Sequence, residues 1–471
     1  MKLEPINDNN KSYLKDESRR TGAAEAILFP ETVEEVCQAL KQKTGLTLQG
    51  ARTGFSGGAV PEGGSVLNLS RLTEAGRVEK ADQGGSLTVQ CGVTLETVDR
   101  LAAAAGLRFP PDPTEQSATL GGMFSTGATG PDSLRFGPCS RWIGGLTWAA
   151  PTGELWQFRR GDYVLRRHSL PLPDGQTLDL AGYAGPKALY EGMDLIDFLS
   201  GTEGYLGAAL SLDLTLIPKA GDLWGVVFFF RNPEELPAFG QKLLGRKGLN
   251  AAEFYDEATL SLLDAHRDSP LLTRLPAFPE GARAALYVEL EGENEEETTD
   301  ALMDLLDAFA ACGGSEEDTW AENGPEAVRK FRDLRHAVPS VLNESNALHD
   351  PETGCRWELD LAGRPEDFPH WLSAYRIALE ETGLSAALYG HLLENRLRVA
   401  LLPERESDHP RCADFVRRMT EKAVDGAGPA VTEYEVGRLR RRLLGQLLLP
   451  EQKRMLEELR RVFDPDFKMN P

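Results

Sequence analysis

The stretch Gln49-Gly-Ala-Arg-Thr-Gly54-Phe-Ser-Gly57-Gly58 decides the fold of this chain. Its glycines can adopt positive φ angles and let backbone N–H groups converge on an anion, and a pyrophosphate is the natural guest of such a loop. The spacing is not Gly-x-Gly-x-x-Gly, and no Gly-Lys-Ser/Thr follows, which excludes a Rossmann fingerprint and a P-loop. A hairpin loop without a ligand is the alternative interpretation.

The same stretch contains Gly54-Phe-Ser56-Gly-Gly58, which matches the Gly-x-Ser-x-Gly pattern of serine hydrolases. A nucleophile elbow needs a strand before the serine and a helix after it. Here the sequence continues Ala59-Val-Pro-Glu-Gly-Gly64, which cannot form a helix. The hydrolase hypothesis is therefore disfavoured, and labelling of Ser56 by a fluorophosphonate probe would be its sign.

Elements on either side of the loop have clear periodicity. A helix is expected at residues 32–43, because Thr32 and Glu35 form a capping-box pattern. Beyond Asp222, apolar segments alternate with amphipathic ones, which predicts a second α+β layer with helices on one face of a mostly antiparallel sheet. Further strands are expected at residues 46–48, 65–69, 87–91, 223–230 and 284–291, and further helices at 94–105, 233–244 and 296–311.

Length and composition indicate a large protein of ordinary globular character. A chain of 471 residues with 41% hydrophobic residues exceeds one ordinary domain. The net charge of −22 disfavours nucleic acid and anionic membranes as partners. The first residues lack the apolar core of a signal peptide, and no apolar run is long enough to span a bilayer. Six widely spaced cysteines form no Cys-x-x-Cys pair, so we expect reduced thiols in a cytoplasmic protein.

Three further Gly-rich or Pro-rich segments follow the first, at residues 110–113, 119–130 and 201–207, and the chain closes with Phe463-Asp-Pro-Asp-Phe-Lys-Met-Asn470-Pro471. In this order and spacing, the sequence resembles the FAD-linked oxidases and dehydrogenases of the vanillyl-alcohol oxidase type over nearly its whole length. It is most similar to the branch that contains D-lactate, glycolate and D-2-hydroxyglutarate dehydrogenases.

The resemblance implies an α+β architecture with a two-lobed PCMH-type FAD-binding domain and an α+β cap domain whose sheet is mostly antiparallel. The FAD-binding domain would comprise residues 1–218, the cap residues 219–440, and residues 441–471 would return to the FAD domain. The shift in sequence character at Asp222 agrees with the first boundary.

The resemblance also implies where FAD is held. The first loop would cradle the pyrophosphate, residues 111–112 and 119–130 would line the ribityl chain and flavin, and residues 201–207 would close over the adenine side. Thr53 stands where many relatives carry a histidine bonded to the flavin, so we expect non-covalent FAD. Gly127 stands where the family usually has Asn, which removes a polar contact. The implied FAD-binding residues are Gly50, Ala51, Arg52, Thr53, Gly54, Ser56, Gly57, Gly58, Pro111, Asp112, Thr119, Gly121, Gly122, Ser125, Thr126, Gly127, Gly130, Glu203, Gly204, Gly207 and Asn470.

Oxidation of a 2-hydroxy acid needs a cation for the carboxylate and a base for the hydroxyl proton. The segment Phe331-Arg-Asp-Leu-Arg335-His336 resembles the one that supplies a carboxylate-binding arginine in the family, which points to Arg335. The alternative is a surface arginine on an amphipathic helix.

The family's metal site reads His-x-Gly-Asp-Gly-Asn-x-His with a later Glu-His-Gly. Here His391 is kept, Arg398 replaces the second histidine, Glu433 is kept, and Tyr434 replaces the later histidine. One His and one Glu beside an arginine hold a divalent cation poorly, so we expect no metal. Tyrosine, with a pKa near ~10, needs a nearby cation such as Arg398 to act as a base. The alternative is a site that has lost catalysis.

The favoured hypothesis is an FAD-dependent oxidoreductase that oxidises a small 2-hydroxy acid or related anionic alcohol by hydride transfer to flavin N5, without a metal. Arg335 and Arg398 would hold the anion, Tyr434 with His391 would handle the proton, and a quinone, flavoprotein or iron–sulfur protein would accept the electrons. Two alternatives stay open: an FAD-binding, catalytically reduced subunit of a glycolate-oxidase-like complex, and a flavin-binding protein without turnover.

Overall fold

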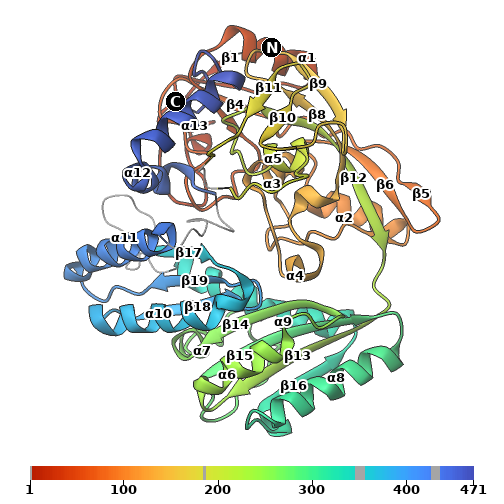
Figure 1. Ribbon diagram of the computed structural model, residues 1–471, viewed down its shortest axis with the longest axis vertical. Helices are drawn as coiled ribbons and strands as arrows, with labels where there is room; N and C mark the ends of the chain where they lie inside the picture. Colours follow the sequence, from red (N-terminus) through yellow and green to blue (C-terminus); the bar gives the residue numbers. More distant parts are fainter. Residues whose placement is uncertain (1–2, 184–186, 345–355, 426–434, 471) are drawn as a thin grey trace. The chain divides into compact units, whose positions relative to one another are not determined.

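The computed structural model describes residues 3–183, 187–344, 356–425 and 435–470 (Figure 1). The chain divides into two compact units. Unit 1 comprises Met1–Gly130, Pro138–Lys219 and Glu433–Pro471, and unit 2 comprises Pro131–Gly137 and Ala220–Thr432. The boundaries expected from the sequence, after residues 218 and 440, remain a proposal for the functional domains.

The first sheet of unit 1 carries the glycine loop. Its strand order is β1-β2-β4-β3, with β1 antiparallel to β2 and the other pairs parallel. Helix α1 has Thr32 as its N-cap, whose side chain accepts from the Glu35 N–H, as the capping pattern predicts. The elements are β1 (Leu3–Pro5), β2 (Ala26–Leu28), α1 (Val33–Gln42), β3 (Leu46–Gln49) and β4 (Ser65–Asn68).

The second sheet of unit 1 is antiparallel, in the order β5-β6-β12-β8-β9, and β7 pairs with β12. Helices α1, α2, α3, α5 and α13 and the β10–β11 hairpin add to a core that includes Leu87, Trp148 and Leu212. The strands are β5 (Glu79–Ala81), β6 (Gly84–Gln90), β7 (Leu107–Arg108), β8 (Ile143–Ala149), β9 (Leu155–Arg159), β10 (Ser169–Pro171), β11 (Thr177–Asp179) and β12 (Ala208–Pro218). The helices are α2 (Leu95–Ala104), α3 (Leu120–Thr126), α5 (Leu195–Leu199), α12 (Gly437–Leu447) and α13 (Pro450–Phe463).

The closing segment of the chain returns to the first sheet. The Leu46 N–H donates to Lys468 O and the Asn470 N–H donates to Leu46 O, so residues 468–470 cover the open edge of β3. Phe463 and Met469 are buried in the same core as α1 and β3.

Unit 2 is built on one seven-stranded antiparallel sheet in the order β16-β13-β15-β14-β18-β19-β17 (Figure 1). Its central strands β13, β14 and β15 are buried over most of their length. The strands are β13 (Asp222–Phe230), β14 (Leu249–Asp256), β15 (Ala284–Gly292), β16 (Thr319–Asn323), β17 (Glu358–Ala362), β18 (Ala386–His391) and β19 (Arg396–Leu401).

Helices cover both faces of this sheet, and the expectation of helices on one face is wrong. Helices α6, α8, α10 and α11 pack on one face with Phe228, Phe254 and Leu388. Helices α7 and α9 pack on the other face with Phe229, Tyr255 and others. Short α4 also belongs to this unit. The helices are α4 (Ser133–Phe136), α6 (Leu236–Leu243), α7 (Glu257–Asp264), α8 (Glu295–Ala310), α9 (Pro325–Glu344), α10 (Phe368–Thr382) and α11 (His409–Asp425).

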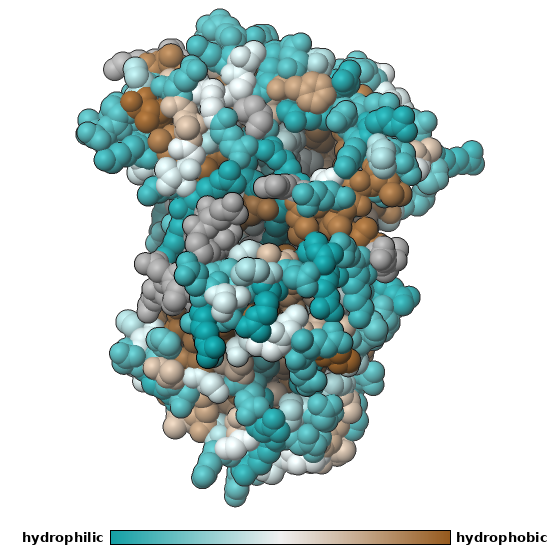
Figure 2. Space-filling model, turned by 90° about the vertical axis from the view of Figure 1, so that its left-hand side faces the viewer, coloured by the Kyte–Doolittle hydropathy of each residue, from teal (hydrophilic) through white to brown (hydrophobic). Residues whose placement is uncertain are grey.

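Hydrophilic residues dominate much of the face shown in Figure 2. The large apolar side chains exposed in the described part of the chain are Leu3, Leu155, Tyr190, Met303, Ile377 and Leu449. No helix in that part combines the length and the apolar character that a bilayer crossing requires. The five cysteines that the structure describes carry free thiols, and Cys355 lies outside the described residues.

Candidate active site

The glycine loop begins where β3 ends and packs against the N-terminus of α3. A Cβ added at Gly50 would collide with the Thr119 hydroxyl, so only glycine permits this approach. Thr119 caps α3 by accepting from the Gly122 N–H at 3.3 Å, and Asn68 Nδ2 donates to Gly50 O at 3.2 Å. Two of the expected FAD-binding segments therefore lie side by side.

Backbone conformation in the loop suits an anion site. Arg52 has φ +66° and Gly57 has φ +75°, both in the left-handed region. Arg52 is held there with its guanidinium carbon 4.1 Å from the centre of the Tyr13 ring. Ala51 and Thr53 are half-buried in the same loop.

One N–H of the loop already binds an anionic group. The Ser56 N–H donates to Glu435 Oε1 at 3.2 Å, and a Cβ added at Gly54 would collide with that carboxylate. The Ser56 N–H therefore has an oxygen acceptor where a phosphate is expected, so the backbone of the loop fits a pyrophosphate oxygen of FAD once Glu435 is displaced. The sequence analysis missed Glu435, since no pattern marks it as a neighbour of the loop.

The segment at residues 201–207 lies at the C-terminal end of α3. The Gly201 N–H donates to Phe124 O at 2.9 Å and the Glu203 N–H donates to Ser125 O at 2.8 Å. Asn470 Nδ2 donates to Glu203 O at 2.6 Å, which joins the closing segment to the same place. Gly127 ends α3 with φ +67° and ψ +37°.

Several other glycines expected at the FAD site lie where another part of the chain comes too close to leave room for a Cβ. A Cβ at Gly130 would collide with Asp112 O, beside Pro111, and one at Gly207 would lie 2.5 Å from Ala149 O. Gly121 packs against Cys91, where a Cβ would lie 2.6 Å from the cysteine Cβ. Thr126 Oγ1 donates to Gly122 O within α3. Gly58 lies beside the Glu435 side chain. Gly204 lies beside Leu48 and Asn470.

Two carboxyl groups near the loop have pKa values above the ordinary range. Burial raises the pKa of Asp16 to about 6, and Glu435 adds to that rise. Burial raises the pKa of Glu203 to about 7, again with a contribution from Glu435. The carboxylate of Glu203 accepts from the N–H groups of Val436 at 2.6 Å and Gly437 at 2.9 Å.

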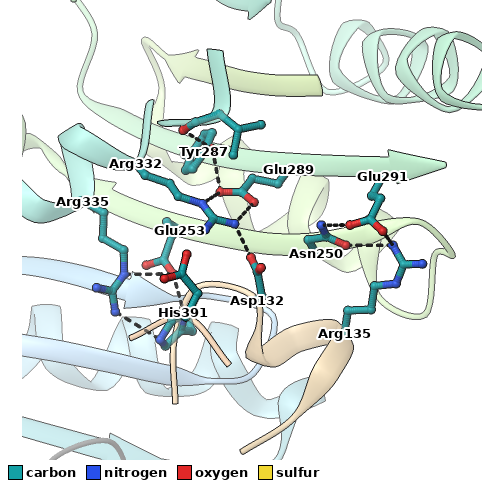
Figure 3. A network of polar contacts seen from close by, with 12 residues as sticks. Asp132, Arg135, Asn250, Glu253, Tyr287, Glu289, Glu291, Arg332, Arg335 and His391 are labelled. Atoms are coloured by element: carbon teal, nitrogen blue, oxygen red, sulfur yellow. Dashed lines mark hydrogen bonds and ion pairs between the residues drawn. The ribbon is translucent and has the colours of Figure 1, made fainter. Parts of the chain in front are cut away.

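Unit 2 contains a second polar cluster, on the face of its sheet that α9 covers (Figure 3). His391 on β18 pairs in register with Glu253 on β14, and His391 Nδ1 lies 2.5 Å from Glu253 Oε1. Arg335 on α9 brings Nε to 3.3 Å from the same oxygen and Nη2 to 3.4 Å from His391 Nε2. All three side chains are at most 4% exposed. The structure thus brings Arg335 and His391 together through Glu253, which the sequence analysis missed.

A neighbouring network continues along the same face (Figure 3). Arg332 Nε donates to Glu289 Oε1 at 2.6 Å, and Nη2 donates to Asp132 Oδ1 at 2.5 Å. Arg135 Nη1 donates to Asn250 Oδ1 at 3.0 Å and pairs with Glu291 at 3.4 Å. Residues 131–137 are therefore tied to unit 2 by charged hydrogen bonds.

Arg398 lies on the same sheet face as His391. It is opposite Tyr389 in the β18–β19 pair, and Tyr389 and His391 are two residues apart on one strand, so their side chains share a face. The guanidinium carbon of Arg398 lies 5.6 Å from the centre of the Tyr389 ring. In the β17–β19 pair, Asp360 lies opposite Arg398 in register. Glu433 and Tyr434 lie outside the described residues.

His336, next to Arg335 in sequence, has a pKa lowered to about 4 by burial and by the nearby arginine charge. It is therefore neutral at physiological pH. Within residues 3–183, 187–344, 356–425 and 435–470, no group of three or more His, Cys, Asp or Glu side chains is arranged to hold a metal ion. Because Glu433 is outside these ranges, the expected absence of a metal stays a prediction.

Comparison with protein-family models gives two matches that together span most of the chain. Residues 24–159 match an FAD binding domain, and residues 225–471 match the C-terminal domain of FAD linked oxidases, which is more than half of the chain. The chain belongs to the FAD-linked oxidases. FAD is accordingly the cofactor of this FAD-linked oxidase, and its class of activity is oxidoreduction.

Curated relatives of this FAD-linked oxidase align over nearly all of both chains. A D-lactate dehydrogenase of Anaerostipes hadrus is 24% identical over 98% of this chain and 92% of its own length. A D-2-hydroxyglutarate dehydrogenase of Xanthomonas citri pv. viticola is 25% identical over 100% and 93%. Glycolate oxidase subunit GlcD of Bacillus subtilis is 23% identical over 95% and 88%. The chain is an FAD-linked oxidoreductase of the branch that contains the D-lactate, D-2-hydroxyglutarate and glycolate enzymes.

Among solved structures, alkyldihydroxyacetonephosphate synthase superimposes with a TM-score of 0.60 at 14% identity. The match covers 96% of this chain and 76% of that one. At this identity the likeness shows a shared fold of the PCMH type and nothing about the substrate. The expected fold class is therefore confirmed.

Proposed function

We propose that this FAD-linked oxidase oxidises a small 2-hydroxy acid or a related anionic alcohol. The observation that carries the proposal is the buried cluster of Arg335, Glu253 and His391 in unit 2. The relatives, which include enzymes named dehydrogenases of D-lactate and D-2-hydroxyglutarate, support the same substrate class.

The cluster would combine the two functions that such a substrate requires, a cation and a base. A 2-hydroxy acid carries its hydroxyl and carboxylate on adjacent carbons, so the base and the cation that serve them must also be neighbours. His391 Nε2 and Arg335 Nη2 are 3.4 Å apart. Arg335 would pair with the carboxylate through its guanidinium, and His391 would accept the hydroxyl proton.

Glu253 would orient the histidine. Its Oε1 lies 2.5 Å from His391 Nδ1, so a proton on Nδ1 would face the carboxylate while Nε2 faces Arg335 Nη2. The same carboxylate would stabilise the imidazolium that forms when Nε2 takes a proton. Arg398 would add positive charge on this face and favour the alkoxide, which supports oxidation without a metal.

FAD, when bound, would accept the two electrons that leave the substrate. Its pyrophosphate would lie on the glycine loop at Gly54 and Ser56, and Thr53 offers no imidazole for a covalent bond, so we propose that FAD is held non-covalently. An external quinone, flavoprotein or iron–sulfur protein would then reoxidise it. Roles for Glu433 and Tyr434 stay predictions.

The test is anaerobic reduction of the FAD-loaded protein, followed by its visible spectrum. D-Lactate, glycolate, D-2-hydroxyglutarate and L-lactate are added in turn, with and without EDTA. Bleaching by one acid, unchanged by EDTA, is expected. Bleaching that EDTA abolishes would overturn the metal-free mechanism, and no bleaching by any acid would overturn the substrate class.

Matched variants locate the chemistry. His391→Gln should slow flavin reduction by roughly 10²- to 10⁴-fold, and Arg335→Leu should raise the substrate concentration needed for half-maximal rate. The controls are His370→Gln and Arg364→Leu, which change the same residue types at exposed positions of unit 2. Equal rates in His391→Gln and His370→Gln would exclude His391 as the base.

The alternative is an FAD-binding subunit with little activity of its own, as part of a glycolate-oxidase-like complex. One relative is named a glycolate oxidase subunit, which favours this alternative. It predicts a flavin spectrum that no acid bleaches in the isolated chain and co-purification with a partner from the native host. A chain that purifies alone and turns over would dismiss it.

A further inference from the structure

The glycine loop of unit 1 is engaged by a side chain of the same unit. Glu435 is 6% exposed, and its Oε1 accepts from the Ser56 N–H at 3.2 Å. The side chain fills the space beside the loop, because a Cβ added at Gly58 would lie 3.4 Å from Glu435 Cγ and one at Gly54 would collide with its carboxylate. A carboxyl oxygen thus occupies an N–H group of the loop.

Contacts on the C-terminal side of Glu435 hold it in place. The Leu439 N–H donates to Ser56 O at 3.2 Å, and Arg438 Nε donates to Val60 O at 3.0 Å. Gly437 packs so closely on Ser56 O that a Cβ would collide with it. Residues 435–439 are therefore anchored along the loop, and the position of the carboxylate follows from that anchoring.

The electrostatic surroundings make the carboxylate a competitor of another anion. Asp16 and Glu203 reach the same region from two other segments, and each has its pKa raised in part by Glu435. A pyrophosphate carries further negative charge. Binding it beside Glu435 would place like charges in a buried region, where their repulsion is weakly screened.

We propose that Glu435 competes with the FAD pyrophosphate for the Ser56 N–H and thereby sets how tightly the chain holds its cofactor. The inference rests on the proposed use of this loop for FAD. The carboxylate caps the loop, and FAD would bind there only when the side chain leaves Ser56. Glu435→Ala removes both the competing acceptor and the repulsion, whereas Glu435→Gln keeps an acceptor oxygen and removes the repulsion.

The experiment compares FAD binding by the apo-forms of the wild-type chain, Glu435→Gln and Glu435→Ala. Dissociation constants come from quenching of flavin fluorescence, and folding of each variant is checked by circular dichroism. Both variants should bind FAD roughly ten- to a hundredfold more tightly, which is the usual worth of a hydrogen bond to a charged group. Glu451→Gln, an exposed change on α13, is the control and should match the wild type.

Inorganic pyrophosphate serves as a second probe, because it reports on the loop without the flavin. Its effect on the thermal unfolding midpoint should be larger in Glu435→Gln than in the wild type. FAD affinity equal to or weaker than wild type in both folded variants would overturn the proposal. If no form of the chain binds FAD, the use of the loop for FAD fails as well. If FAD binds more tightly in the variants but no hydroxy acid reduces it, the substrate proposal fails and this inference stands.

Discussion

Glu253 is the residue through which the unit 2 cluster is coupled, because one of its oxygens contacts both Arg335 and His391. Removing one member of a buried ion pair leaves an uncompensated charge, which costs about 3–5 kcal/mol of unfolding free energy. Removing both partners costs less than the sum. We therefore expect Glu253→Gln and Arg335→Leu to be non-additive, with a coupling energy of about 1–3 kcal/mol.

Urea unfolding of the two single variants and the double variant measures this coupling. The matched pair is Glu253→Gln with Arg364→Leu, since Arg364 is exposed and pairs with Asp367. The effects of this pair should add within about 0.5 kcal/mol. Additive effects for Glu253 and Arg335 would mean that their contact contributes no net stability.

Glu203 makes the stability of unit 1 depend on pH. Its folded pKa of about 7 lies above the ordinary value of 4.5, so its contribution is fully present below about pH 4.5 and is lost as the pH rises through 7. Glu203→Gln cannot ionise, and we expect it to flatten the fall of unfolding free energy between pH 4.5 and 7. The exposed change Glu154→Gln should keep the wild-type slope in urea titrations at each pH. Parallel curves for Glu203→Gln and wild type would contradict the shift.

At this scale the sequence led to Arg335 and His391 only through the family resemblance. Glu253 and Glu435 escaped notice for a physical reason. Each acts through a partner that is distant in sequence, and such a pairing exists only once strand register or a chain return has been fixed by the fold. An isolated Glu in a buried strand carries no local pattern that announces it.

Among the elements, α3 shows how a helix end positions the expected flavin segments. Gly127 ends this helix in the left-handed conformation, which costs about 1–2 kcal/mol for a residue with a Cβ and less for Asn. Gly127→Ala should lower the unfolding free energy by about 1 kcal/mol, and Gly127→Asn should lower it less. Thermal unfolding checks the order.

A glycine within a regular helix supplies the control. Gly445 lies inside α12 with open space where a Cβ would be. Gly445→Ala should raise the unfolding free energy by about 0.5–1 kcal/mol, because Ala loses less entropy in a helix. If Gly127→Ala were also stabilising, the left-handed cap would not be what requires glycine there.

The elements themselves were largely predictable from periodicity and caps. The helix at residues 32–43 is α1, and the strand at 223–230 is most of β13. The covering of both faces of the unit 2 sheet was missed, although the continuous apolar run of β13 was a sign of it, since a strand with one wet face alternates. The placement of residues 131–137 in unit 2 could not be predicted, because it depends on charged partners far along the chain.

For the molecule as a whole, the net charge of −22 should slow the approach of an anionic substrate. Added salt screens this field, since the Debye length falls from about 30 Å at 0.01 M to about 8 Å at 0.15 M. We expect the second-order rate constant of flavin reduction by a 2-hydroxy acid to rise roughly severalfold over this range. Stopped-flow reduction at increasing KCl measures it. The neutral methyl ester of the same acid should show no such rise, and a fall with salt for the acid itself would mean that the local arginines govern its approach.

The path of the chain through the two units has a consequence for biosynthesis. Apart from the short excursion at Pro131–Gly137, unit 2 is one continuous stretch, whereas unit 1 is completed only by Glu433–Pro471. A ribosome therefore exposes every residue of unit 2 while β3 still lacks the neighbours it gains from residues 468–470. Because domains tend to pack as their residues emerge, the nascent chain would finish its middle before its beginning. During that interval the edge of β3 is unpaired, and an unpaired strand edge is a template for aggregation that a chaperone would protect.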